Sequence, residues 1–246
     1  MIDPTFTIIV FILIGIMAFL YASVGHGGAS GYLAILAIFS FSPAVMKPSA
    51  LILNVFVAII SFYQYYKSGY FKWKLFWPFA LGSIPASYLG STIPLSDTIY
   101  KKVLGVALLF AIIRLIFSIK ESGELTKNPN PLISMSIGIF IGLLSGMIGI
   151  GGGIILSPVI LLFHWGNMKE TAAVSALFIF VNSMAGLAGL FGKPLTLTPE
   201  IYGWIAISII SGAAGAYFGT QKFNPVLLKR VLALVLCIAG VKLIFT

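Results

Sequence analysis

The chain has 246 residues, of which 59% are hydrophobic and 9% are charged, and its formal net charge is +9. A soluble domain carries roughly 25% charged residues, so this composition excludes an ordinary cytosolic enzyme, a nucleic-acid binder and a disordered chain. The cations interrupt apolar runs, which is typical of loops beside lipid headgroups. The class that remains is an all-α polytopic membrane protein, which we expect to contact the lipid bilayer and not nucleic acid.

Charged residues divide the sequence into apolar stretches of one or two helix lengths. At about 20 residues per span, the following stretches fit one crossing each: 48–66, 75–96, 103–119, 171–192, 201–221 and 231–246. Two others, 4–46 and 128–168, are about twice as long as one span. The N-terminal run has no basic leader and no small-residue cleavage site, so we expect it to be retained as the first span.

The two halves of the chain resemble each other on either side of a polar segment. The sequence GHGG at 25–28 corresponds to GIGG at 149–152. The pair MK at 46–47 corresponds to MK at 168–169, and further matches follow in the same order. An ordered series of matches indicates an internal duplication. The predicted organisation is a first repeat, a polar linker and a second repeat, with about five helical segments in each repeat: 1–119, 120–131 and 132–246.

Each predicted repeat contains a glycine-rich interruption after its first helix. The interruption falls at 25–31 in the first half and at 149–153 in the second. The apolar residues that remain before the next lysine, 32–46 and 154–168, make about 22 Å of helix, less than the ~30 Å of the hydrocarbon core. Short helices broken by glycine at matching positions are typical of the binding site of a secondary transporter.

The relative direction of the two halves depends on whether the short helix crosses the membrane. Five crossings in each half place the second half upside down relative to the first. A re-entrant short helix leaves four crossings in each half, and the halves then run parallel. The distribution of lysines predicts which side is cytoplasmic if all ten segments cross, but it does not decide between the two arrangements.

The glycine breaks can carry a binding site for an anion. Glycine allows the chain to turn where a side chain would clash, and successive N–H groups at a helix start attract negative charge. Exposed amides in the bilayer interior must meet a ligand or line a cavity. The alternative is close helix packing through small residues. We expect substrate contacts from both breaks, at Gly25, His26, Gly27, Gly28, Gly149, Gly151, Gly152 and Gly153.

Small polar side chains near the breaks form a second group of candidates, of which Ser30, Asn54, Ser175 and Asn182 are the expected substrate contacts. The same group contains Ser23, Ser49, Ser145, Ser157 and Thr171. Ser175 and Asn182 share one helix face with Thr171, which is typical of a substrate pathway or of interhelical hydrogen bonds. His26 has no histidine counterpart in the second break. It fits an anion donor, the carrier of a coupling proton, or a loop histidine at the water boundary.

Acidic residues lie outside the middle of the apolar runs. Buried carboxylates are typical of cation-coupled pumps, so the sequence favours an anionic substrate. No nucleophile and base can be paired around Ser145, and we expect no catalytic residue, no metal site and no cofactor. A passive anion channel on the same scaffold and an assembly subunit without transport are the alternatives, and a homo-oligomer is left open.

Two halves that each open with a Gly-x-Gly-Gly break, then a short helix and a helix that starts with lysine, resemble the sulfite exporter TauE/SafE family of membrane permeases. The resemblance covers nearly the whole chain. It implies a multi-pass secondary transporter of the plasma (inner) membrane that moves small sulfur-containing or organic anions, such as sulfite or sulfonates. His26 and Ala29 depart from the fuller glycine run of the family.

Overall fold

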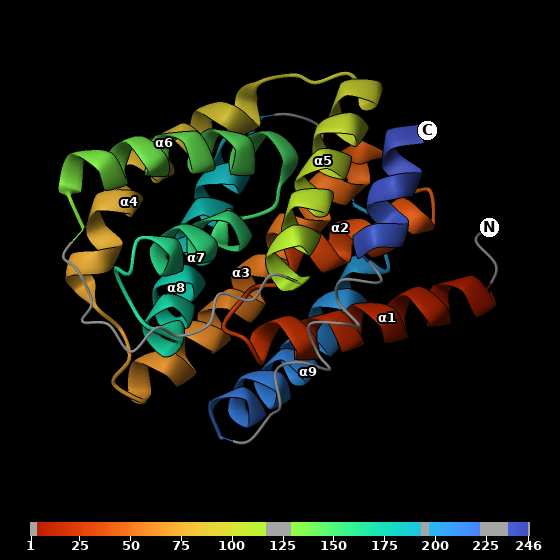
Figure 1. The fold of residues 1–246 in the computed structure, drawn as a ribbon. Helices are drawn as coiled ribbons and strands as arrows, with labels where there is room; N and C mark the ends of the chain where they lie inside the picture. Colours follow the sequence, from red (N-terminus) through yellow and green to blue (C-terminus); the bar gives the residue numbers. More distant parts are fainter. Residues whose placement is uncertain (1–3, 117–128, 193–196, 222–235, 246) are drawn as a thin grey trace.

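The computed structural model describes residues 4–116, 129–192, 197–221 and 236–245 (Figure 1). The labelled helices are α1 (Pro4–Ala22), α2 (Ala29–Ile38), α3 (Pro43–Lys67), α4 (Trp73–Thr92), α5 (Asp97–Ile116), α6 (Pro131–Ile148), α7 (Gly153–Leu162), α8 (Met168–Ala188) and α9 (Ile201–Gln221). A further helix, Leu236–Phe245, lies near the C-terminus. No strand occurs in the described residues, so the predicted all-α class with about ten helical segments is confirmed.

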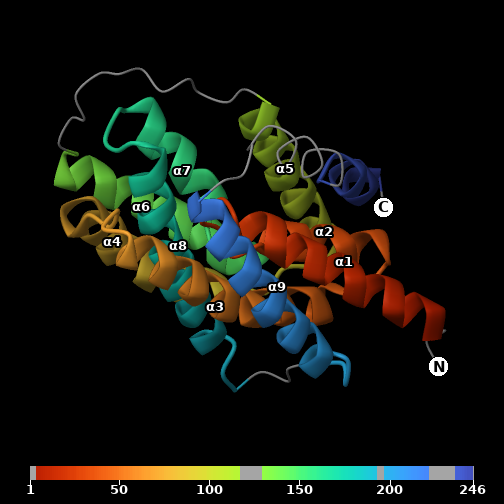
Figure 2. The same ribbon diagram turned by 90° about the horizontal axis from the view of Figure 1, so that it is seen from below.

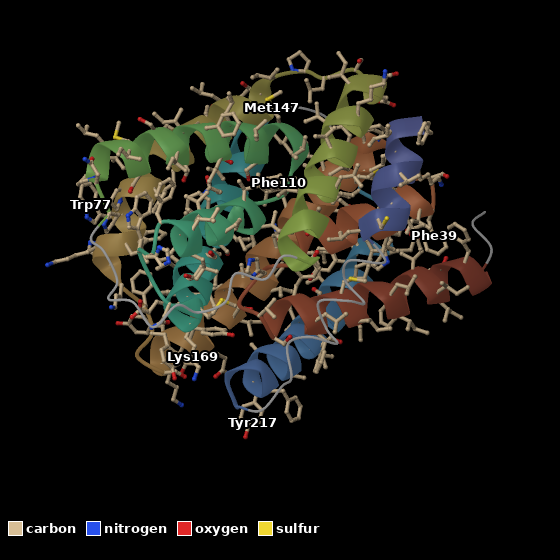
Figure 3. The ribbon with its side chains drawn as sticks, in the orientation of Figure 1. Phe39, Trp77, Phe110, Met147, Lys169 and Tyr217 are labelled. Carbon is tan, nitrogen blue, oxygen red and sulfur yellow. The ribbon has the colours of Figure 1, made fainter. Side chains whose placement is uncertain are left out.

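The outer surface of the helices is apolar. α3, α6, α8 and the part of α9 from Ile201 to Gly219 are long and apolar enough to cross a membrane. Large apolar side chains such as Leu81 and Ile210 are exposed, and Figure 3 shows Trp77 and Tyr217 at the periphery. Exposed apolar side chains over so much of the surface fit hydrocarbon and not water. The chain is therefore built as a membrane protein.

α3 and α8 lie at the centre, between two flanking helix pairs. α4 packs along α6 on one flank and α1 packs along α9 on the other, as both views show (Figures 1 and 2). α5 packs against the helix Leu236–Phe245, where Gly105 and Gly240 allow a close approach. Each of these pairs contains one helix from either side of the predicted linker. The two halves of the chain are therefore interleaved and do not form separate bodies.

Contacts between the helices occur in matched sets. The contact of α4 with α6 corresponds to that of α9 with α1, and the contact of α4 with α8 corresponds to that of α9 with α3. In the same way, α2 packs on α3 as α7 packs on α8. This pattern supports the two-repeat organisation, which stays a prediction.

The two central helices run antiparallel. Tyr65, near the end of α3, clusters with Ala172, near the start of α8. Asn54, nearer the start of α3, donates to Ser183 Oγ at 3.3 Å, and Ser183 lies near the end of α8. Residue numbers therefore fall along α3 as they rise along α8. An inverted pair of repeats requires this arrangement, and two parallel halves would not produce it.

The short helices end earlier than the positions of the lysines predict. α2 ends at Ile38 and α7 ends at Leu162. A residue with positive φ follows soon after each end, Ser40 at 60° and His164 at 56°. α3 begins before Lys47, which therefore lies inside that helix. The prediction that the short helix extends to the lysine is wrong, because a lysine inside a helix can still extend its ammonium group to water.

Glycines bring the backbones of the flanking pairs into direct contact. Three glycines of α6, one turn apart, face carbonyl groups of α4: Gly138 faces Phe79, Gly142 faces Ser83 and Gly146 faces Ser87. Gly215 of α9 faces the Phe19 carbonyl of α1 in the same way, and Gly219 faces the carbonyl of Ser23, which directly follows α1. A side chain at these positions would meet backbone atoms, so close packing through small residues explains the glycines of the flanks.

We expect Gly146→Ala to lower the free energy of unfolding by about 1–3 kcal/mol, the usual cost of overpacking, because the added methyl group would overlap the Ser87 carbonyl. Thermal unfolding of the purified protein in detergent measures the effect. Gly203→Ala is the control, because a methyl group there would lie 3.4 Å from Phe11 Cε2 and alanine favours a helix. Equal melting temperatures for the two variants would contradict the close-packing role.

Candidate functional site

The first break connects α1 to α2 through a chain that turns at glycine residues. Gly25 and Gly28 have φ values of +74° and +98°, a left-handed conformation that glycine adopts without strain. The N–H groups of Gly25 and His26 donate to carbonyl groups at the end of α1. The N–H groups of Gly27 and Gly28 belong to buried residues and find no acceptor among the described residues.

The second break, between α6 and α7, also turns through left-handed glycines. The φ values of Gly149, Gly151 and Gly152 are +82°, +78° and +78°. The N–H of Gly149 donates to the Ser145 carbonyl at 2.7 Å, which closes α6. Within the described part of the chain, the N–H groups of the buried residues 150–153 have no acceptor. Both breaks thus present buried donors at the start of a short helix, where the helix dipole is positive.

Asn54 of α3 links the two breaks. Its Oδ1 accepts from the N–H of Ala29 at 2.9 Å, and its Nδ2 donates to the Ile150 carbonyl at 3.4 Å. A methyl group on Gly27 would lie 2.5 Å from Oδ1, and one on Gly151 would lie 2.6 Å from Nδ2. The glycines of the two breaks therefore flank a single amide side chain.

The breaks enter from opposite ends of α3 and meet in the interior. At the start of α3, a methyl group on Gly149 would lie 3.0 Å from Lys47 Cγ. Near the end of α3, the Tyr65 hydroxyl donates to the Ser23 carbonyl at 3.3 Å. An α-helix rises about 27 Å between Lys47 and Tyr65, and Asn54 lies about 10 Å along that distance. The meeting point therefore lies between the two ends of α3 and not at either of them.

A buried hydroxyl group without a hydrogen-bond partner accompanies each break. Tyr32 is 0% exposed, and its hydroxyl oxygen would lie 2.7 Å from a methyl group on Gly28. Ser145 is 1% exposed, and its Cβ would lie 3.5 Å from a methyl group on Gly152. Neither hydroxyl has a partner in the described structure. Buried polar groups are normally paired, so these two hydroxyls could each donate to a ligand with acceptor atoms.

His26 connects the first break to α7 and α8. Its side chain is 5% exposed, so His26 does not lie at a water boundary. Nδ1 lies 2.9 Å from the Val24 carbonyl oxygen, and Nε2 lies 3.0 Å from Ser157 Oγ. Ser157 Oγ in turn lies 2.8 Å from Ser175 Oγ and 2.9 Å from the Gly153 carbonyl oxygen. The first break therefore shares a hydrogen-bond network with the first residue of α7.

The other sequence-predicted polar residues lie around this centre. Ser30 donates to the Tyr21 hydroxyl of α1 at 2.7 Å. Asn182 faces α4, where its Nδ2 donates to Ser83 Oγ at 3.0 Å. Ser175 and Asn182, which share a face of α8, therefore contact different elements, and of the two it is Ser175 that joins the His26 network.

Both breaks are closed off in this conformation. All residues of 25–28 and 149–153 are buried. The first break packs on Ala172 of α8, and close to that residue Lys72 and Glu170 form an ion pair at 2.7 Å. In this conformation the surrounding helices therefore cover the meeting point of the breaks.

Tyr32 and Ser183 are not among the sequence-predicted candidates, whereas Ser157 is. Tyr32 lies four residues after Gly28 of the first break, and this one-turn spacing is the signal that identifies it. Ser183 accepts from Asn54 across the two central helices. No spacing in the sequence indicates that contact, because it depends on how α3 crosses α8.

An all-helical membrane protein whose buried donors converge at two broken helices has the design of a membrane transporter. The sequence profile of the sulfite exporter TauE/SafE family matches residues 9–243, and the chain belongs to this family. The predicted resemblance is confirmed, and a family of permeases is not a family of enzymes.

Two relatives carry the same type of name. A probable membrane transporter protein of Sinorhizobium fredii is 36% identical over 94% of this chain and 95% of its own length. A probable membrane transporter protein of Haemophilus influenzae is 27% identical over 96% of this chain and 97% of its own length. The family and these relatives show that the protein is a membrane transporter. No solved structure matches the chain.

We expect Asn54→Leu to lower the free energy of unfolding by about 1–3 kcal/mol, the cost of a buried donor left without its acceptor, because the Ala29 N–H loses Oδ1. Thermal unfolding in detergent measures this loss. Ser68→Ala is the control, because it removes only an exposed hydrogen bond to the Gln64 carbonyl at the end of α3. An Asn54→Leu protein as stable as the wild type would show that the breaks do not depend on this amide.

Proposed function

We propose that the protein is a secondary transporter that moves small sulfur-containing or organic anions, such as sulfite or sulfonates, as a multi-pass protein of the plasma membrane. The anion binds where the two glycine breaks meet, one break from each predicted repeat. Membership in the sulfite exporter TauE/SafE family and the names of the relatives support the transport role. The choice of an anion rests on the chemistry of the breaks.

The observation that carries the proposal is the set of buried N–H groups without acceptors at both breaks. A peptide N–H inside a membrane costs free energy unless it meets an acceptor, and a helix start favours a negative partner. The segments 23–31 and 145–157 contain no acidic residue, so no carboxylate of these segments competes for the donors. An oxyanion offers several oxygen acceptors on one small group, which suits donors that converge from two sides.

The closed state of the site favours alternating access over a passive channel. A secondary transporter passes through a state in which its site is closed from both sides, whereas a conducting channel needs a continuous path. Polar contacts lie near opposite ends of the antiparallel central helices. Lys72 pairs with Glu170 at the start of α8, and Lys47 at the start of α3 donates to the Ser91 carbonyl at 3.3 Å. We propose that the site opens to one side of the membrane at the first of these ends and to the other side at the second.

Flux of sulfite and of methanesulfonate into proteoliposomes tests the proposed function. The expected result is saturable uptake that exceeds the uptake by empty liposomes, together with faster exchange when the same anion is loaded inside. A step-like conductance in a planar bilayer would identify a passive channel. Uptake equal to that of empty liposomes for both anions would overturn the proposed substrate class.

We expect Tyr32→Phe to raise the KM for the anion by about tenfold or more, because a hydrogen bond to a charged partner contributes about 1.5–3 kcal/mol. The melting temperature should not fall, because the Tyr32 hydroxyl has no partner within the described residues. Initial rates in proteoliposomes and thermal unfolding give the two readouts. Tyr202→Phe, which removes a hydroxyl from a side chain that is 79% exposed, is the control and should leave both unchanged.

Ser145→Ala tests the second break in the same way, and the same rise in KM is expected. A glycine substitution is less informative, because a methyl group on Gly152 would lie 2.8 Å from Ile141 Cγ2 and 2.9 Å from Phe178 Cε1 and would disturb packing. Wild-type KM values in both hydroxyl variants would show that the anion does not bind at the breaks.

A further inference from the structure

We infer that His26 binds the proton that drives this transport, so that the anion and the proton bind and move together. The inference rests on the proposed function and adds its coupling ion. His26 is the titratable side chain inside a glycine break, and its two ring nitrogens contact different elements.

The hydrogen bond at Nδ1 determines which ring nitrogen can gain or lose a proton. A carbonyl oxygen only accepts, so the contact between Nδ1 and the Val24 carbonyl at 2.9 Å requires a proton on Nδ1. Neutral histidine then has an unprotonated Nε2, which accepts from Ser157 Oγ at 3.0 Å. Protonated histidine donates from Nε2 to the same oxygen. Proton uptake therefore takes place at Nε2, next to Ser157.

The single hydroxyl proton of Ser157 transmits this change to the second break. When His26 is neutral, the Ser157 hydroxyl donates a hydrogen bond to Nε2, and the Ser175 hydroxyl can donate a hydrogen bond to Ser157 Oγ at 2.8 Å. When His26 is protonated, Ser157 is free to donate to the Gly153 carbonyl at 2.9 Å. The Ser157 hydroxyl thus changes its acceptor from His26 in the first break to the carbonyl of Gly153, the first residue of α7. The charge on His26 and the geometry of the second break are therefore linked.

Titratable groups on the elements around His26 include several that have other partners, and the Tyr32 hydroxyl of α2, which has none among the described residues. From α8, Lys169 contacts the Tyr70 hydroxyl at 2.9 Å, and Glu170 pairs with Lys72. From α1, the Tyr21 hydroxyl accepts from Ser30, and from α3 the Tyr65 hydroxyl donates to the Ser23 carbonyl. α7 contains no titratable residue.

A negative substrate at the breaks is the partner that suits a charged His26. Opposite charges attract strongly where water is excluded, so the anion favours the protonated form of His26. Linkage makes the effect reciprocal, because a proton that raises the affinity for the anion is itself bound more tightly when the anion is present. The proton comes from water on one side, binds Nε2, and returns to water on the other side with the anion. For a monovalent anion this transport is electroneutral.

Methanesulfonate is the suitable probe, because it keeps a single negative charge over the range in which histidine titrates, whereas sulfite changes between a monoanion and a dianion. We expect wild-type proteoliposomes to accumulate labelled methanesulfonate against its gradient when the outside is more acidic, and to lose this accumulation when a protonophore is added. We also expect the Kd for methanesulfonate, measured from its effect on thermal unfolding in detergent, to rise as the pH rises through the range of histidine titration, about pH 5 to 8.

His26→Gln keeps a hydrogen-bonding amide that cannot titrate at these pH values. We expect its residual uptake to be the same at all values between about pH 5 and 8, the range of histidine titration. His164→Asn is the matched control, because it removes the other histidine of the chain, whose φ of 56° asparagine tolerates. This control should keep the wild-type response to pH.

The outcomes separate this inference from the proposed function. Methanesulfonate uptake that does not respond to a pH gradient, or a Kd that is constant with pH in the wild type, would overturn the role of His26 and leave the transporter intact. The same holds if His26→Gln keeps the wild-type pH response. Absence of saturable uptake for every anion at every pH would overturn the proposed function and this inference together. If His26→Gln does not fold, the pH dependence of uptake and of the Kd in the wild type still tests the proton coupling.

Discussion

Peptide groups that leave a helix inside a membrane need new partners, and this requirement organises the centre of the protein. Asn54 provides some of these partners. Its neutral amide carries an acceptor and a donor in one flat group, so it can form hydrogen bonds with both breaks at once. A charged residue at this position could bond one kind of group only and would need its own counter-charge. The N–H groups that Asn54 does not reach stay available for a ligand.

The flanking pairs limit how such a site can open. The α4–α6 and α1–α9 contacts join the two sides of the predicted linker through glycines that touch backbone carbonyl groups. Backbone contacts of this kind cannot slide without losing their fit. The breaks have no comparable constraint, because left-handed glycines such as Gly25 and Gly149 change direction without a side-chain clash. The free-energy cost of moving the backbone is therefore lowest at the two breaks, near the ends of α3.

The architecture follows from local sequence patterns, whereas the site depends on tertiary contacts. Apolar runs and paired glycines predict the helices and the two breaks, because both are properties of neighbouring residues. The positions of the lysines mispredict the ends of α2 and α7, because Lys47 lies inside α3, where its ammonium group donates to the Ser91 carbonyl. Asn54 is a predicted candidate, but its position between the breaks requires the antiparallel crossing of α3 and α8. The contact of His26 with Ser157 likewise joins residues 131 positions apart, which no local pattern encodes.

A transporter must release its substrate, and for the anion proposed here this requirement would account for the absence of a fixed charge on the segments that form the breaks. A buried arginine or lysine would hold an anion tightly and would remain charged when the anion leaves, at a high desolvation cost. Peptide N–H groups and hydroxyls bind more weakly, so entry and release can both occur. A histidine adds positive charge when its proton arrives and removes it when the proton leaves. Neutral donors with one titratable neighbour therefore reconcile binding with release, and this chain combines them at Gly27, Gly151 and His26.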